Sequence, residues 1–130
     1  MEDFYYRNLN VYQQAKELVA DVYALSRSFP SSEQYGLTNQ IQRAAISVPS
    51  NIAEGMGRFS YKERVHFIEI AYASLMEVMC QLEISEMLGY ITPETLETQD
   101  AKLRILTRML LGLRTSIEEK EKNNINHVRQ

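Results

Sequence analysis

Residues 92–117 read TPETLETQDAKLRILTRMLLGLRTSI, and this stretch decides the fold of the chain. Its apolar side chains recur at spacings of three, four and seven residues, which is typical of a helix that packs in a bundle. The residues on this face are Leu96, Leu103, Leu106, Leu110, Leu113 and Ile117. The start of the helix is marked as well, since Thr92 can cap it, Pro93 fits its first position and Glu94 suits its positive end.

Three more helices are predicted upstream, over residues 10–29, 32–57 and 60–88. The first of these helices is expected to end at Pro30, the second at Gly55 and Gly57, and the third at Gly89. The second is expected to begin with a cap from Ser31 or Ser32, and the third with the capping box of Ser60 and Glu63. Short loops make neighbouring helices antiparallel, so we predict an all-α, up-and-down four-helix bundle. Residues 1–130 form one domain, with an ordered core at about 9–120 and a polar tail, 118–130, that frays.

Pro49 lies inside the second predicted helix. A proline has no N–H and presses on the preceding turn, so the helix either kinks or breaks there. We predict a kink, because the apolar phase continues through the proline in Ile41, Ala45, Val48, Ile52 and Met56. Ser47 and Asn51 flank Pro49 and are expected to satisfy the backbone carbonyls that it leaves without donors.

The polar residues of this second helix fall within one arc, opposite the apolar ones. They are Arg43, Ser47, Ser50, Asn51, Glu54 and Arg58. The arc is either a solvent-facing side or a hydrogen-bonded seam in which Arg43, Glu54 and Arg58 are joined by charge-assisted contacts. A structural role is favoured over ligand binding.

The third predicted helix is apolar nearly all round. Its core stripe is expected to be Val65, Ile68, Ala71, Tyr72, Leu75, Met79 and Leu82, while Phe67, Ile70, Met76, Val78, Cys80, Ile84, Met87 and Leu88 lie on other faces. A bundle buries one stripe of each helix, so the second face needs a partner. Self-association into a closed ring or dimer is favoured, and coverage by Tyr and Phe residues of the N-terminal segment is the alternative.

The sequence offers no constellation for catalysis, so we do not expect an enzyme, a cofactor or a small-molecule substrate. His66 and His127 are far apart in sequence and no paired Glu-x-x-His motif occurs, so no metal site is predicted. The glycine-rich turn at residues 55–58 could seat an anion, but a helix stop is favoured. A single Cys80, no apparent signal peptide and no long unbroken apolar run predict a cytoplasmic protein without a membrane span.

Residues 40–58, QIQRAAISVPSNIAEGMGR, closely resemble the signature of the four-helix-bundle family named for the 23S rRNA intervening-sequence protein. Further residues that fit are Phe29, Pro30, Glu33, Tyr35, Gly36 and Leu37 before this run, and residues 67–71 with Ser74, Glu77, Gln81 and Leu82 after it. The resemblance spans residues 9–117, and Ala73 departs from the glycine that is usual there. It marks Arg43, Ser47, Pro49, Asn51, Glu54, Gly55 and Arg58 as motif residues, expected to be structural rather than catalytic.

The family is similar to an accessory protein of diversity-generating retroelements, which forms a five-membered ring and binds nucleic acid. The resemblance therefore implies a bacterial homopentamer that associates with RNA or DNA. Candidate contacts are Arg43, Arg58, Lys62, Arg64, Lys102, Arg104 and Arg108. The net charge of −3 stands against this hypothesis. The alternative is a protein-interaction or assembly scaffold that binds no nucleic acid.

Overall fold

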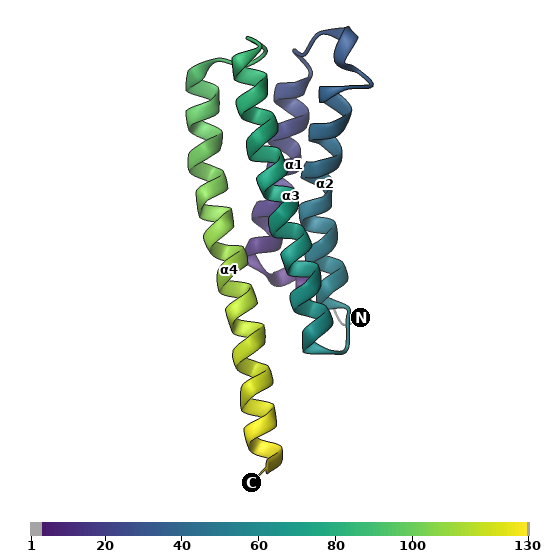
Figure 1. Cartoon of the computed structure of the whole chain (residues 1–130), viewed down its shortest axis with the longest axis vertical. Coiled ribbons are helices and arrows are strands. Elements are labelled where there is room, and N and C mark those ends of the chain that lie inside the picture. Colours follow the sequence, from purple (N-terminus) through teal and green to yellow (C-terminus); the bar gives the residue numbers. More distant parts are fainter. Residues whose placement is uncertain (1–3, 130) are drawn as a thin grey trace.

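Four long helices lie side by side in the computed structural model of the chain, which describes residues 4–129 and the side chains of residues 4–125 (Figure 1). They are α1 (Asn10–Ser26), α2 (Leu37–Met56), α3 (Tyr61–Met87) and α4 (Pro93–Arg129), with short 3-10 helices η1 (Tyr5–Asn8) and η2 (Ser31–Glu33). Successive helices run antiparallel, and each packs against the next, with α4 returning to α1. No strand occurs in the described residues, so the predicted four-helix bundle is confirmed.

The core forms where the apolar stripes of the four helices meet. Each helix contributes fully buried side chains, among them Val22, Ile41, Ile52, Leu75 and Leu103. The seam predicted from residues 92–117 is confirmed: Leu103, Leu106, Leu110 and Ile117 are buried, and Leu96 and Leu113 pack partly buried against them. Burial of apolar surface is therefore what holds the helices together.

Two predicted helix starts are confirmed at the level of single hydrogen bonds. Ser60 Oγ accepts the N–H of Glu63 at 3.1 Å, which caps α3. Thr92 Oγ1 accepts the N–H of Thr95 at 3.1 Å, which caps α4. Between these helices Gly89 has a φ of +79°, the left-handed conformation that a glycine tolerates without strain.

The predicted start of the second helix is wrong. Ser31 belongs to η2, and α2 begins only at Leu37. The cap is supplied by Glu33, whose Oε1 accepts the N–H of Leu37 at 3.3 Å, while its Oε2 accepts the hydroxyl of Tyr90 at 3.0 Å. That second bond raises the pKa of Tyr90 above its ordinary value. A carboxylate four residues before the helix thus replaces the serines predicted from their position.

Helix ends also differ from the sequence-based expectation. The first helix stops at Ser26 instead of residue 29, although Phe29 remains buried against Tyr90 with ring centroids 5.5 Å apart. At the other end of the chain, where fraying is predicted, α4 continues to Arg129 and projects past the other helices (Figure 1). The extension is anchored in part by Asn124, whose Nδ2 donates to the Tyr61 hydroxyl at 2.8 Å. Helix-favouring Glu and Lys residues make up much of this segment.

The α3 helix has the length and mean hydropathy of a membrane span, although charged residues interrupt it and no long unbroken apolar run occurs. A core helix of a soluble protein has the same composition. Ile68, Leu75 and Leu82 of α3 are buried in the bundle core, and the helix packs against both α2 and α4. Its central position therefore explains part of its apolar character, since 39% of this apolar window is buried in the bundle.

Candidate functional site

Two residues of the polar arc of α2, Ser47 and Asn51, lie where α2 meets α3, whereas Ser50 is exposed and lines the groove between α1 and α2. Asn51 Nδ2 donates to the backbone oxygen of Ser47 at 2.8 Å and to its Oγ at 2.9 Å. The same Ser47 Oγ is 2.8 Å from the Oγ of Ser74 on α3, which is buried. These three side chains form a hydrogen-bonded link between the two helices, which we call the serine–asparagine link.

Pro49 is buried within a helix that runs unbroken from Leu37 to Met56, so α2 does not break there. The bend at Pro49 stays a prediction. The carbonyl that Pro49 leaves without its usual donor is that of Ala45, four residues earlier. Asn51 instead donates to the carbonyl of Ser47, one turn back. The prediction that Asn51 satisfies the carbonyl freed by Pro49 is therefore wrong, because Asn51 bonds a different carbonyl.

The predicted cluster of Arg43, Glu54 and Arg58 does not form. Arg58 Nη2 pairs with Glu54 Oε1 at 3.0 Å, with side chains 40% and 53% exposed. Arg43 lies about 16 Å further along the axis, since eleven residues separate it from Glu54. It lines an open groove of about 340 Å³ together with Ser47, Ser74 and Glu77. The structure thus splits the arc into an ion pair at one end and a polar groove at the other.

Gly55 has a role that the sequence did not reveal. It is buried in the last turn of α2, and a Cβ at this position would lie 2.9 Å from Phe67 Cβ and 3.3 Å from the backbone oxygen of Arg64. We interpret it as the residue that lets α2 and α3 approach closely, and not only as a helix stop. Gly57 ends the helix with a φ of −86°, so that end needs no left-handed residue.

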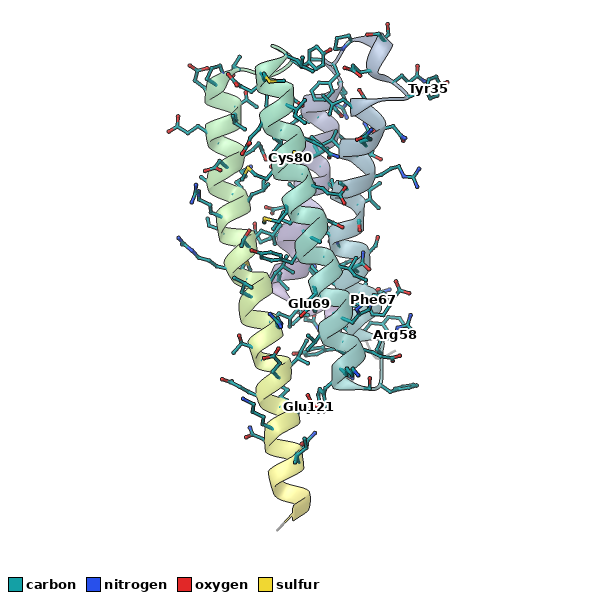
Figure 2. The ribbon with its side chains drawn as sticks, in the orientation of Figure 1. Tyr35, Arg58, Phe67, Glu69, Cys80 and Glu121 are labelled. Atoms are coloured by element: carbon teal, nitrogen blue, oxygen red, sulfur yellow. The ribbon has the colours of Figure 1, made fainter. Side chains whose placement is uncertain are left out.

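The connection between α2 and α3 gathers three of the candidate basic residues: Arg58, Lys62 and Arg64, which we call the basic turn. Arg64 Nε donates to the backbone oxygen of Arg58 at 2.7 Å, and its guanidinium lies 5.4 Å from the centre of the Tyr61 ring. The Arg58 guanidinium lies 4.5 Å from the centre of the Phe67 ring, and Figure 2 shows the two residues beside each other. Lys62 is exposed, and neither it nor Arg64 forms an ion pair among the described residues.

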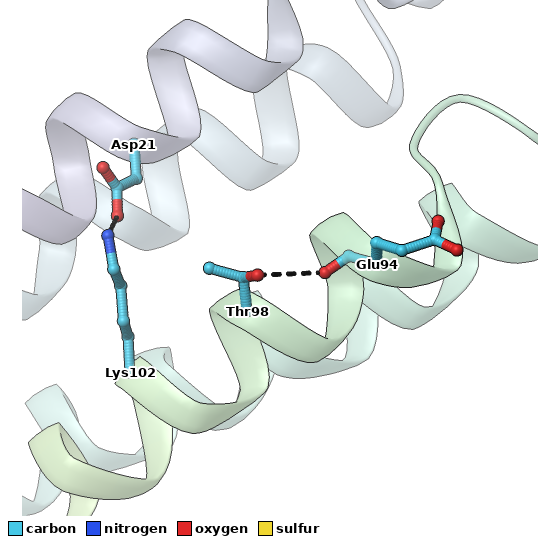
Figure 3. A network of polar contacts seen from close by, with 4 residues as sticks. All are labelled: Asp21, Glu94, Thr98 and Lys102. Atoms are coloured by element: carbon cyan, nitrogen blue, oxygen red, sulfur yellow. Dashed lines mark hydrogen bonds and ion pairs between the residues drawn. The ribbon is translucent and has the colours of Figure 1, made fainter.

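The candidate basic residues of α4 lie elsewhere and are largely neutralised. Lys102 Nζ pairs with Asp21 Oδ2 of α1 at 2.9 Å, beside the bond from Thr98 Oγ1 to the Glu94 carbonyl (Figure 3). Arg104 Nε lies 2.7 Å from Asp100 Oδ2, and this carboxylate raises the pKa of Arg104. Arg108 is exposed, without an ion pair in the part of the chain that the structure describes. The structure therefore does not bring all candidates into one basic surface.

The outer face of α3 carries apolar residues in a row. Ala73, Met76, Cys80, Ile84 and Met87 follow one another at spacings of three and four residues and form what we call the α3 stripe. Ile84 is half-buried, whereas Met76 is 40% and Met87 71% exposed, and Cys80 is also exposed (Figure 2). The stripe is an apolar helix face without a partner inside the described bundle.

The predicted second face of α3 is narrower than the sequence suggested. Val78, predicted to lie outside the core stripe, is fully buried in the core. The alternative cover is not observed, because η1 packs against α1 and α2 instead of α3. Another apolar surface lies in the groove of about 510 Å³ between α1 and α2. Its lining residues are Tyr12, Lys16, Val19, Ala20, Ile46, Pro49, Ser50 and Ala53.

Sites for chemistry are sparse in the described part of the chain. No three His, Cys, Asp or Glu side chains converge there as ligands for a metal ion. His66 is exposed, and His127 lies beyond the described side chains. The surfaces that stand out are those for contact: the serine–asparagine link with its groove, the basic turn and the α3 stripe.

These features define a class: an all-α protein built as an antiparallel four-helix bundle. The chain belongs to the 23S rRNA-intervening sequence protein family, whose model matches residues 7–112, which confirms the predicted resemblance. A crystal structure of a protein of unknown function from the S23 ribosomal protein family of Bacteroides thetaiotaomicron has a similar fold, with a TM-score of 0.72. The two chains are 23% identical, over 80% of this chain and 97% of that one. No functionally curated protein matches the chain.

Proposed function

We propose that this protein is a non-enzymatic assembly protein whose copies associate through the α3 stripe. The observation that supports the proposal is the row of exposed apolar side chains, Met76, Cys80 and Met87, on a helix whose other side fills the core. Exposed apolar faces of this kind mark interaction sites on soluble proteins. The single thiol suits a reducing compartment, so we propose the cytoplasm as the location.

The partner surface that suits the stripe is the groove between α1 and α2 of the next copy. The stripe is about 21 Å long, since 14 residues separate its ends. Glu77 and Glu83 of α3 lie close to the stripe, and Lys16 lines the groove, so opposite charges face each other in such a contact. Because stripe and groove are different surfaces, the contact is head-to-tail and can close into a ring. The number of five subunits is proposed from the family resemblance.

Sedimentation velocity on Met76 variants tests this assembly. We expect the wild type to sediment as a species several times the 15.1 kDa of one chain. Met76→Glu places a charge in the contact and should yield the monomer, whereas Met76→Leu should keep the assembly. Ile105→Glu adds the same charge to an exposed position of α4, 54% accessible, and should also keep it. A monomeric wild type would overturn the proposal.

Association with RNA or DNA is the second candidate function, and the basic turn favours it. Lys62 and Arg64 carry no ion pair there, and an assembly repeats the turn in every copy, so modest local charge accumulates. The paired state of Lys102 and Arg104 makes these two weaker contacts, whereas Arg108 of α4 is exposed and has no ion pair among the described residues.

Fluorescence-anisotropy titration with structured rRNA fragments and unrelated duplex DNA tests this second function. We expect binding at low salt that persists near about 150 mM on RNA and is weakened by Arg58→Glu and by Lys62→Glu. Arg104→Glu is the matched control for Arg58→Glu, because each arginine pairs with a carboxylate four residues earlier and Arg104 lies on α4, away from the basic turn. Absence of binding by the wild type at low salt would contradict nucleic-acid association and leave the alternative of a scaffold for proteins.

A further inference from the structure

An aromatic side chain stands out at the tip of the basic turn. Phe59 is 98% exposed, the highest value among the large hydrophobic residues of the described chain. It lies between the end of α2 and the Ser60 cap of α3, and its ring takes no part in the core. A single exposed apolar side chain is ordinary on a protein surface, so Phe59 points to contact with another molecule only together with the cations of the basic turn beside it.

The backbone on both sides of Phe59 is held in place. The N–H of Gly57 donates to the carbonyls of Ala53 and Glu54, and Arg64 Nε holds the carbonyl of Arg58 at 2.7 Å. After Phe59, the Ser60 hydroxyl caps α3. Since the flanking residues are fixed, binding to the ring requires little ordering of the turn.

The charge around the ring is positive but small. Arg58 is neutralised by Glu54, and Lys62 and Arg64 outnumber Glu63, so residues 54–64 carry a net charge of +1. Lys62 also lines a groove with Glu118, Glu121 and Lys122 of α4, so Arg64 is the stronger of the two cations. So few phosphate contacts give weak binding by themselves. A ligand that is anionic and also presents a flat ring would use both parts of the turn.

We propose that the basic turn binds unpaired nucleotides, with a base stacked on Phe59 and neighbouring phosphates at Lys62 and Arg64. This inference rests on the proposed association with nucleic acid and names its substrate class as single-stranded. In a duplex both faces of an interior base are already stacked, so the ring reaches bases only in single strands, loops or ends. Stacking on an aromatic side chain tolerates any sequence, so affinity depends little on base identity.

The test compares Phe59→Ala with Tyr35→Ala, using a fluorescein-labelled single-stranded RNA of about 20 nucleotides and the same RNA as a duplex. Tyr35 is a matched control, since it is 89% exposed and lies at the opposite end of the bundle from Arg58 (Figure 2). We expect Phe59→Ala to lower single-strand affinity about ten-fold or more and to leave duplex affinity unchanged. Phe59→Trp should restore binding, and Tyr35→Ala should bind as the wild type does.

Several outcomes overturn the proposal in distinguishable ways. If Phe59→Ala binds the single strand as the wild type does, stacking is wrong while nucleic-acid association stands. If the wild type binds neither RNA, the second proposed function fails and this inference fails with it. If Phe59→Ala instead releases the protein from vesicles of phosphatidylserine and phosphatidylcholine, the turn is a membrane contact. If it lowers the sedimentation coefficient of the assembly, Phe59 is buried between copies.

Discussion

Contact between α2 and α3 depends on residues that act in different ways. Gly55 has no Cβ, and this allows the contact, because a Cβ at this position would collide with Phe67 and the backbone of Arg64. The side-chain amide of Asn51 donates to both oxygens of Ser47, which fixes the Ser47 hydroxyl where it hydrogen-bonds Ser74. Neither role follows from sequence spacing alone, since spacing places residues on a face without giving the distance to the next helix.

Gly55→Ala is predicted to destabilise the protein. Overpacking costs about 1–3 kcal/mol and the better helix propensity of alanine returns about 1 kcal/mol, so we expect a net loss of up to about 2 kcal/mol. Gly112→Ala is the control, because nothing lies within 4 Å of the added Cβ on α4. That variant should gain about 0.5–1 kcal/mol. Urea unfolding followed by circular dichroism, at one protein concentration, measures both, and equal stability of the two variants would refute the close-approach interpretation.

Asn51→Ala is predicted to cost about 1–2 kcal/mol of folding free energy, because the Ser47 hydroxyl loses a donor in a half-buried position. Glu54→Ala should cost under about 1 kcal/mol, since its ion pair with Arg58 is exposed. Thermal unfolding of the two variants checks this order. If Asn51→Ala has the same melting temperature as the wild type, the serine–asparagine link contributes nothing to stability.

At the scale of elements, periodicity and capping predicted most of the fold. The seam of α4 and the caps at Ser60 and Thr92 form as expected, because both signals are local. The start of α2 was missed because its cap comes from Glu33, which is held by Tyr90 from a distant part of the chain. The burial of Val78 was missed for a related reason: α3 contacts two helices, which widens its buried face.

Glu33→Ala is predicted to lower stability by about 1 kcal/mol or more, because Leu37 N–H and Tyr90 OH both lose their acceptor. Ser32→Ala is the control, because Ser32 is one of the two serines that the sequence predicted as the cap. This variant should change the free energy of unfolding by less than about 0.5 kcal/mol. Chemical denaturation of both variants is the measurement. A larger effect at Ser32 than at Glu33 would show that the serine is the true cap.

At the scale of the whole molecule, the candidate surfaces were only partly predictable. The sequence predicted a second apolar face on α3 and basic residues near residues 58–64, and the structure gives each a place. It could not show that Asp21 neutralises Lys102, because only folding brings α1 beside α4. The pair of Asp100 and Arg104 is four residues apart on one helix, so spacing alone could have predicted it. Nor did charge and periodicity single out Phe59, whose exposure is a property of the finished turn.

The measurement that tests the assembly most directly is the alkylation rate of Cys80, the single thiol, at different protein concentrations. Cys80 lies in the middle of the α3 stripe, so it is covered when copies associate through this face. We predict slow reaction at concentrations where the assembly forms, and fast reaction after dilution or in Met76→Glu. A fast rate that is the same at every concentration, in a sample that sediments as an assembly, would show that the copies meet through another surface.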